Sequence, residues 1–142
     1  METNQGETDL TKMLANLQPI LSEEKYVYCF HAYPFTPDFP VWASICEQEG
    51  MTLIMAQAEA DKQGFSYEGL WGCITLSVHS SLHAVGLTAC VSKLLSDAGI
   101  SANIVAGYYH DHVFIQAELA EVAWELLQKL GRREEPCILR KI

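Results

Sequence analysis

The sequence has no apolar run close to the roughly 20 residues that a membrane-spanning helix needs. Its first nine residues are polar and carry neither a basic start nor an apolar signal core, so we expect a cytoplasmic protein with no membrane partner. Positive charge is also scarce, because 9 Lys and Arg residues against 18 Asp and Glu residues leave a net charge of −9. Such a chain repels phosphate backbones, and nucleic acid is therefore not an expected partner.

Paired cysteines and catalytic motifs are absent as well. The cysteines are odd in number, far apart and without a C-x-x-C pair, which argues against a disulfide framework or a zinc knuckle: Cys29, Cys46, Cys73, Cys90 and Cys137. We expect them to be small buried side chains in a reducing compartment. The sequence contains no G-x-S-x-G nucleophile motif, phosphate loop or dinucleotide fingerprint, so we predict no catalytic residue and no cofactor.

What the chain does have is enough apolar residues, 49% of 142, for one domain or two small fused halves. We expect a disordered tail over residues 1–8, an N-terminal half over 9–69 and a C-terminal half over 70–142. In the N-terminal half, Asp9 caps a helix predicted over 9–21, because apolar residues recur there at helical spacing, although Pro19 limits its regular end. The elements expected after it are a strand at 26–31, a proline-containing loop at 32–40, a hairpin from 41–46 and 51–56, and a short helix at 58–63 closed by Gly64.

The C-terminal half alternates between strand and helix patterns. Ile74, Leu76 and Val78 share one face of a first strand, and Ser80 or Ser81 is a suitable N-cap for the helix that follows. Gly99 ends that helix in a left-handed cap. The later elements are a strand at 100–107, a strand containing Val113 and Ile115, a helix beginning at Glu118 and stopped by Gly131, and a possible last strand at 137–142.

The resulting order is β-α-β-β-α, with a fourth strand from either 137–142 or the N-terminal half. Right-handed crossovers make this an α+β, ferredoxin-like (βαββαβ) sandwich with two helices on one face of an antiparallel sheet. The opposite face would be covered by the N-terminal half or by another copy of the chain.

Residues 74–115, ITLSVHSSLHAVGLTACVSKLLSDAGISANIVAGYYHDHVFI, resemble an ACT domain. The specific features are the strand, the Val85-Gly86 helix entry, the Gly99-Ile100 helix exit and Asn103. Over residues 10–131 the chain is similar to small stand-alone bacterial proteins that pair a divergent N-terminal ACT-like half with a C-terminal ACT domain. Aspartate-kinase regulatory regions and the CASTOR amino-acid sensors are related to these proteins.

The resemblance implies a non-enzymatic regulatory protein that binds a small molecule, typically an amino acid. The ligand would lie at an interface between two ACT units of a homo-oligomer, either a dimer or a tetramer. The resemblance places the ligand on the loop after the first strand and on the second strand. The corresponding residues are Ser80, Ser81, Leu82, His83, Ala84, Val85 and Gly86, with Asn103, Ile104 and Val105.

The residues themselves favour the same loop. Free N–H groups at a helix start attract a carboxylate, serine hydroxyls add hydrogen bonds, and Gly86 lets a ligand approach the backbone. The alternative is purely structural, with Ser80 and Ser81 only capping the helix and Gly86 only permitting close helix packing.

Two other functions remain open. His79, His83, His110 and His112 could form the metal site of a hydrolase, but a polar hairpin tip explains the YYHDH segment more simply. Exposed Trp42, Phe35 and Phe39 could instead make the contact surface of a partner-binding protein with a vestigial site, although core packing is at least as good a reading of Trp42.

Overall fold

The structure, a computed structural model, describes residues 6–132. Its helices are α1 (Leu10–Ala15), α2 (Gln57–Gln63), α3 (Leu87–Asp97) and α4 (Ala120–Leu130), the last preceded by a 3-10 turn, Ala117–Leu119. Its strands are β1 (Pro19–Leu21), β2 (Tyr26–Ala32), β3 (Ala43–Cys46), β4 (Gly50–Ala56), β5 (Trp71–Leu76), β6 (Asn103–Ala106) and β7 (Asp111–Gln116). The strand predicted at 137–142 lies outside the described residues.

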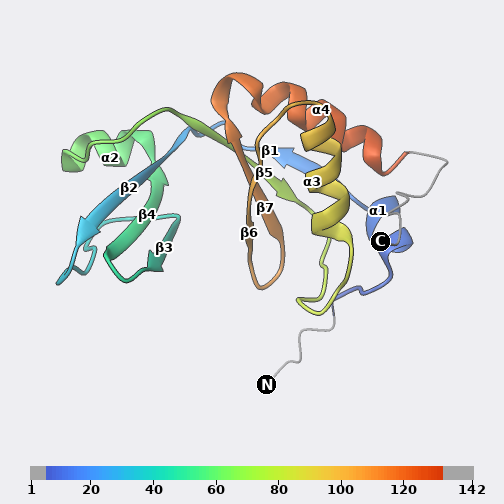
Figure 1. The fold of residues 1–142 in the computed structure, drawn as a ribbon, viewed down its shortest axis with the longest axis horizontal. Helices are drawn as coiled ribbons and strands as arrows, with labels where there is room; N and C mark the ends of the chain where they lie inside the picture. Colours follow the sequence, from blue (N-terminus) through green and yellow to red (C-terminus); the bar gives the residue numbers. More distant parts are fainter. Residues whose placement is uncertain (1–5, 133–142) are drawn as a thin grey trace.

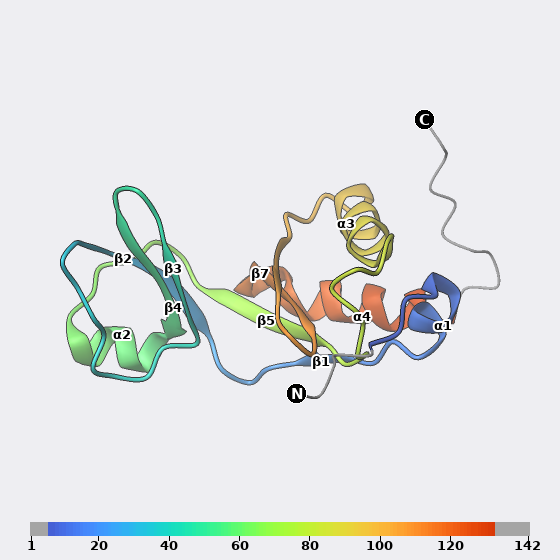
Figure 2. The same cartoon turned by 90° about the horizontal axis from the view of Figure 1, so that it is seen from below.

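All strand pairs are antiparallel, and the strands follow the order β3-β4-β2-β5-β7-β6, with β1 also paired to β5. Strands β2 and β5 meet at one residue pair only, Tyr26 with Trp71. The molecule therefore has two lobes: β2, β3, β4 and α2 lie to one side, and the remaining elements form the larger lobe (Figures 1 and 2). The predicted α+β, ferredoxin-like ACT architecture is confirmed.

The fourth strand of the larger lobe comes from the start of the chain. Strand β1 pairs with β5, placing Pro19 opposite Leu76 and Leu21 opposite Ile74. The helix predicted over 9–21 is therefore correct only as far as Ala15. Residues that precede proline avoid the helical region, which explains why the helix does not continue through Gln18. The indole N–H of Trp124 on α4 donates a 2.9 Å hydrogen bond to the Pro19 carbonyl and secures the short strand.

The main core lies between this sheet and the helices. Ile74, Leu76 and Val78 all belong to it, as the strand alternation predicts. Both long helices contribute the apolar stripes expected of them, including Leu87, Val91 and Leu95 from α3 and Ala123, Leu127 and Leu130 from α4. The predicted end of α3 is confirmed: Gly99 has a φ of 73°, and the N–H of buried Ile100 donates to the Leu95 carbonyl.

The smaller lobe has its own core, which lies between one face of strands β2 and β4 and helix α2. Val27, Cys29, Leu53, Met55 and Ala60 are its buried residues. Where the larger lobe has α3, this lobe has the proline-containing connection between β2 and β3. Phe35 of this connection stacks on His31 with 3.9 Å between ring centroids, and Phe39 packs edge-on against Phe65. Phe35 and Phe39 are thus packing residues rather than an exposed contact surface.

A third cluster joins the lobes. Phe114 of β7 is fully buried and contacts the rings of Tyr26, Tyr28 and Trp42, with Trp42 nearest at 4.8 Å between centroids. Trp42 is therefore a packed aromatic, and the exposed Trp42, Phe35 and Phe39 surface suggested for partner binding does not form. Aromatic rings that meet edge to face attract each other beyond their area of contact, so this cluster stabilises the lobe arrangement.

The cysteines and the N-terminal residues differ in part from the sequence expectations. Cys29, Cys73 and Cys90 are buried as expected, but Cys46 is exposed, and Cys137 lies outside the described residues. Of the tail predicted over 1–8, the structure describes residues 6–8, in which Glu7 pairs with Ser80. None of the helices within residues 6–132 is long and apolar enough to cross a membrane.

Candidate functional site

The predicted site lies in the connection between β5 and α3. The sequence pattern suggested that Ser80 or Ser81 would cap the helix, but α3 begins at Leu87 with Gly86 as its N-cap. The reason is local: the Ser81 hydroxyl accepts from the His83 N–H at 3.1 Å, and its carbonyl accepts from the Ala84 N–H at 2.9 Å. These bonds close a turn before the helix. Gly86, with a φ of 108°, then redirects the chain into α3.

A cavity of about 130 Å³ lies in front of α3. It is lined by Ser80, Ser81, Leu82, Ala84, Gly86, Leu87, Thr88, Ala106 and Asp111. The structure therefore brings together Ser80, Ser81, Leu82, Ala84 and Gly86 from the predicted set. His83 and Val85 do not line the cavity, and Val85 is 82% exposed.

The predicted residues of the second strand lie outside this cavity. Asn103 is exposed on β6, Ile104 packs against the main core, and Val105 packs against the cluster that joins the lobes. Ala106, one residue further along the same strand, is the one that lines the cavity. The sequence pattern located the strand, but the helix position decided which residue of the strand faces the cavity.

Some backbone N–H groups of this region already donate a hydrogen bond within the protein, whereas others are open to a ligand. The N–H groups of Ser80 and Ser81 donate to the carbonyls of Val78 and Glu7, at 2.9 and 3.0 Å. The first bond within the helix runs from the Cys90 N–H to the Gly86 carbonyl. Among the residues that the structure describes, the N–H groups of Leu87 and Thr88 have no acceptor, as the first turn of a helix requires. This end of α3 carries partial positive charge and attracts an anion.

Asp111 supplies the opposite charge in the same cavity. It is the first residue of β7, where it pairs with Leu76 and Ala106. The hydroxyl of Ser80, which is 9% exposed, donates to its Oδ2 at 3.4 Å. The sequence pattern does not single out Asp111 as a site residue. In a regular strand Asp111 points to the opposite face from its neighbours His110 and His112, and this alternation is the one signal that could identify it.

The cavity thus offers open helix amides on one side and a carboxylate on the other. A zwitterionic amino acid has the complementary pair of charges, an α-carboxylate and an α-ammonium. Neutral serine hydroxyls and small apolar side chains complete the lining. Within residues 6–132, no three His, Cys, Asp or Glu side chains gather closely enough to hold a metal ion, so the histidine site gains no support there.

The histidines serve other contacts. His112 Nδ1 lies 2.9 Å from the Thr75 hydroxyl, and its ring meets Trp42 edge-on at 4.9 Å. The ring of His79 lies 5.3 Å from that of Tyr109. His110 has a buried Nδ1 atom with no hydrogen-bond partner in the described part of the chain.

We predict that His112 makes stability depend on pH. Burial lowers the pKa of its imidazole, and nearby His110 lowers it further against the opposing effect of Asp111. An imidazole in the unfolded chain has a pKa of about 6.5. Between that value and the lower folded value the unfolded chain binds more protons. The contribution is therefore complete above about pH 6.5 and is lost as the pH falls through the folded pKa.

The measurement is the midpoint of urea unfolding at about pH 7.5 and about pH 5.5. The loss of stability on acidification should be smaller in His112→Gln than in the unmodified protein. His83→Gln is the matched control, because His83 is exposed and does not contact the aromatic cluster. Equal losses in both variants would show that His112 does not carry the effect.

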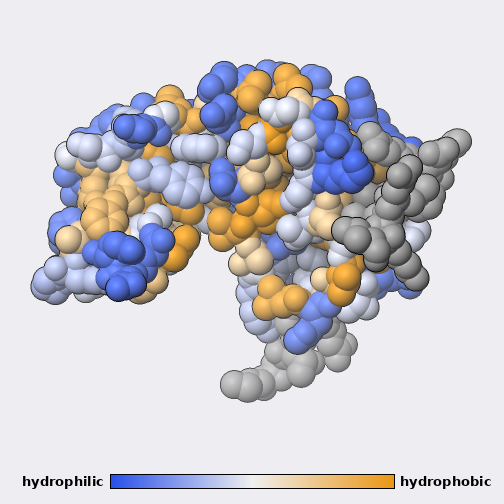
Figure 3. All heavy atoms as spheres, in the orientation of Figure 1, coloured by the Kyte–Doolittle hydropathy of each residue, from blue (hydrophilic) through white to orange (hydrophobic). Residues whose placement is uncertain are grey.

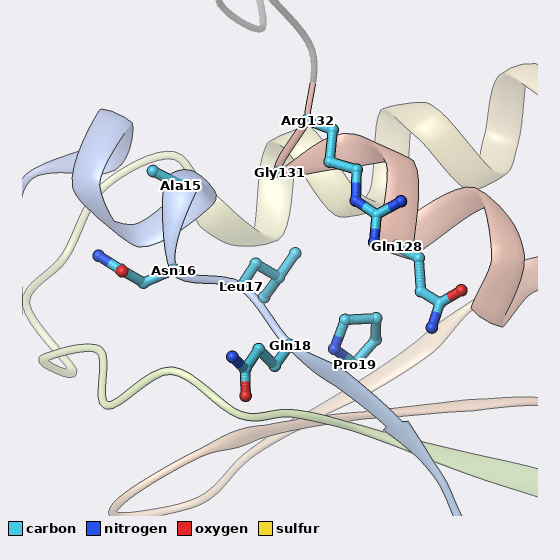
Figure 4. A pocket seen from close by; sticks show the side chains of 8 residues that line it. All are labelled: Ala15, Asn16, Leu17, Gln18, Pro19, Gln128, Gly131 and Arg132. Atoms are coloured by element: carbon cyan, nitrogen blue, oxygen red, sulfur yellow. The ribbon is translucent and has the colours of Figure 1, made fainter.

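A second hollow of about 310 Å³ lies where α1 and α4 end (Figure 4). It is lined by Ala15, Asn16, Leu17, Gln18, Pro19, Gln128, Gly131 and Arg132. The last carbonyls of two helices carry partial negative charge and Arg132 is cationic, but no carboxylate lines this hollow. The cavity before α3 places a full negative charge, that of Asp111, beside open helix amides, and it is therefore the candidate site.

Comparison with known proteins agrees with this architecture. Models of the ACT domain match residues 5–71 and residues 71–129. A Vibrio cholerae protein of unknown function, described as a possible transport protein, is 38% identical with a TM-score of 0.78, over 86% of this chain and 95% of that one. A search of curated proteins found no match.

More distant structures share the fold. The ligand-free regulatory subunit of aspartate kinase from Thermus thermophilus is 12% identical with a TM-score of 0.59, over 79% of this chain and 95% of that one. An Agrobacterium tumefaciens protein is 17% identical with a TM-score of 0.66, over 81% of this chain and 89% of that one. With two successive ACT-domain matches and a two-lobed ferredoxin-like fold, the chain belongs to the ACT-domain family.

Proposed function

We propose that the chain is a regulatory amino-acid-binding protein whose ligand occupies the cavity in front of α3. ACT domains are regulatory, non-catalytic units that typically bind small molecules such as amino acids. The observation that carries the proposal is the placement of open helix amides and Asp111 around one cavity. The α-carboxylate of the ligand accepts hydrogen bonds from the N–H groups of Leu87 and Thr88, and its α-ammonium faces Asp111.

Self-association is part of the proposal. Leu82, which lines the cavity, and nearby Val85 are 60% and 82% exposed, so apolar surface surrounds the site. Apolar side chains also gather over the middle of the face shown in Figure 3, beside the recess between the lobes. A second copy docked over such surface would enclose the ligand. A ligand with higher affinity for the assembled state would then shift the chain toward a dimer or tetramer, which is the coupling that regulation requires.

Isothermal titration against each of the twenty amino acids tests the site. At least one should bind, and Ser81→Trp should abolish binding because an indole fills the cavity. Gly86→Trp should also abolish it, because a side chain at this position meets Leu10 and displaces the start of α3. Gly64→Trp is the matched control for Gly86→Trp: both glycines have a positive φ, but Gly64 ends α2 with no atom within 4 Å of its Cβ position. Failure of all twenty to bind, or unchanged binding in both cavity variants, would reject the proposed site.

A further inference from the structure

We propose that residues 6–8, the N-terminal arm, position the loop between β5 and α3 and thereby keep the cavity open for its ligand. The inference deepens the proposed function and rests on it for the ligand. It concerns a segment that sequence patterns place in a tail. In the structure the arm lies against the predicted site and contacts it through the backbone.

The arm pairs with the loop as a short parallel bridge. The Glu7 N–H donates to the His79 carbonyl at 2.8 Å, and the Ser81 N–H donates to the Glu7 carbonyl at 3.0 Å. Gly6 comes still closer, because a Cβ at this position would lie 2.5 Å from the Ser81 nitrogen. A side chain there would force the arm and the loop apart. Glycine is thus needed for the close approach and not for an unusual φ.

The arm is itself ordered by local hydrogen bonds. Glu7 Oε1 accepts from the N–H groups of Thr8 and Asp9, both at 2.9 Å, and these bonds lower the pKa of its carboxyl group. The Asp9 carboxylate then accepts from the Lys12 N–H at 3.0 Å and caps α1. The arm therefore leads directly into α1, and α1 is anchored in the main core by fully buried Met13.

The same segment reaches the other end of the loop. Leu10, the first residue of α1, lies beneath Gly86, with its Cδ2 atom 2.9 Å from the position of a Cβ at Gly86. One continuous stretch of chain thus holds both Ser81, early in the loop, and Gly86, where α3 begins. The loop's own turn, made by Ser81, is the only other hydrogen-bonded support recorded between these two points within residues 6–132.

The arm also sets which amides a ligand can use. The Glu7 carbonyl occupies the Ser81 N–H, whereas the N–H groups of Leu87 and Thr88 stay open. A docked arm therefore directs a carboxylate to the first turn of α3. When the arm is displaced, the Ser81 amide is released and the start of the loop loses its backbone pairing with Glu7, so the cavity no longer keeps its shape.

Two truncations separate the arm from the residues before it. One variant joins Met1 to Gly6 and keeps the arm, and the other joins Met1 to Asp9 and removes it while retaining the cap of α1. Gly6→Val displaces the arm in the full chain. Amide hydrogen exchange, resolved by residue with NMR and measured without ligand, should be about tenfold faster at Ser81, His83 and Ala84 in the arm-less and Gly6→Val variants only.

Unchanged exchange at His83 and Ala84 in both of these variants would overturn the inference, because the loop would then hold its shape without the arm. Amino-acid titration gives the second readout: the variant that keeps the arm should bind like the full chain, and the arm-less variant about tenfold more weakly. Equal affinities would also overturn the inference. If none of the twenty amino acids binds the full chain, the proposed function fails, and hydrogen exchange alone still decides whether the arm positions the loop.

Discussion

Replacing Asp111 with asparagine is expected to weaken amino-acid binding by about 2 kcal/mol, or roughly thirtyfold. The substitution keeps the size of the side chain and removes its negative charge, so the ligand's ammonium group loses its ionic partner in the cavity. Folding should change little, because the recorded side-chain bond of Asp111 is a 3.4 Å contact with the Ser80 hydroxyl. Titration of the amino acid that binds the unmodified chain, together with urea unfolding, measures both effects.

The matched control is Asp97→Asn at the opposite end of α3. Asp97 forms an exposed ion pair with Lys93 at 2.7 Å, far along the helix from the residues that line the cavity. Exposed pairs of this spacing contribute only about 0.3–0.5 kcal/mol, so binding should be unchanged in this variant. An Asp111→Asn protein that binds the amino acid as tightly as the unmodified chain would remove Asp111 from the site.

Replacing Phe114 with alanine is expected to lower the free energy of unfolding by about 3–5 kcal/mol. Phe114 is fully buried, and its ring meets those of Tyr26, Tyr28 and Trp42 at nearly right angles. Truncation leaves a cavity and removes three aromatic contacts at once. The two lobes share one strand pair beside this cluster, so few other contacts can compensate. Urea unfolding at equilibrium measures the loss.

Phe30→Ala provides the comparison for this substitution. Phe30 lies on β2 and is 53% exposed, so the same change of residue type removes much less buried surface. Its cost should be well below that of Phe114→Ala. Similar losses in the two variants would mean that the aromatic cluster relaxes around the missing ring, and that the lobes are held together mainly by the chain connections.

Local periodicity predicted the larger lobe well because its elements follow simple rules. The alternation of Ile74, Leu76 and Val78 and the left-handed cap at Gly99 both depend on neighbours within a few residues. Such patterns also sufficed for the family resemblance and for the loop that lines the cavity. The smaller lobe was predicted with its hairpin and α2, although the packing of its aromatic loop was not.

The same rules failed where a distant partner decides the conformation. Leu17 and Leu21 continue the helical spacing of α1, yet Leu21 lies in β1 because the open edge of β5 needs hydrogen-bond partners. Glu7 looks like part of a polar tail until the carbonyl of His79 and the amide of Ser81 are placed beside it. In both cases the backbone groups, which carry no sequence signal, determine the structure.

The sequence by itself determined most of the strands, the two long helices and the loop that lines the cavity, since each follows from the pattern of neighbouring side chains. Tertiary structure alone decided that α3 starts at Gly86, that Ala106 and Asp111 reach the cavity, and that the N-terminal arm lies across the loop. The physical reason is that a binding cavity depends on where separate elements meet. Their meeting is governed by backbone pairing and packing between residues that lie far apart in the chain.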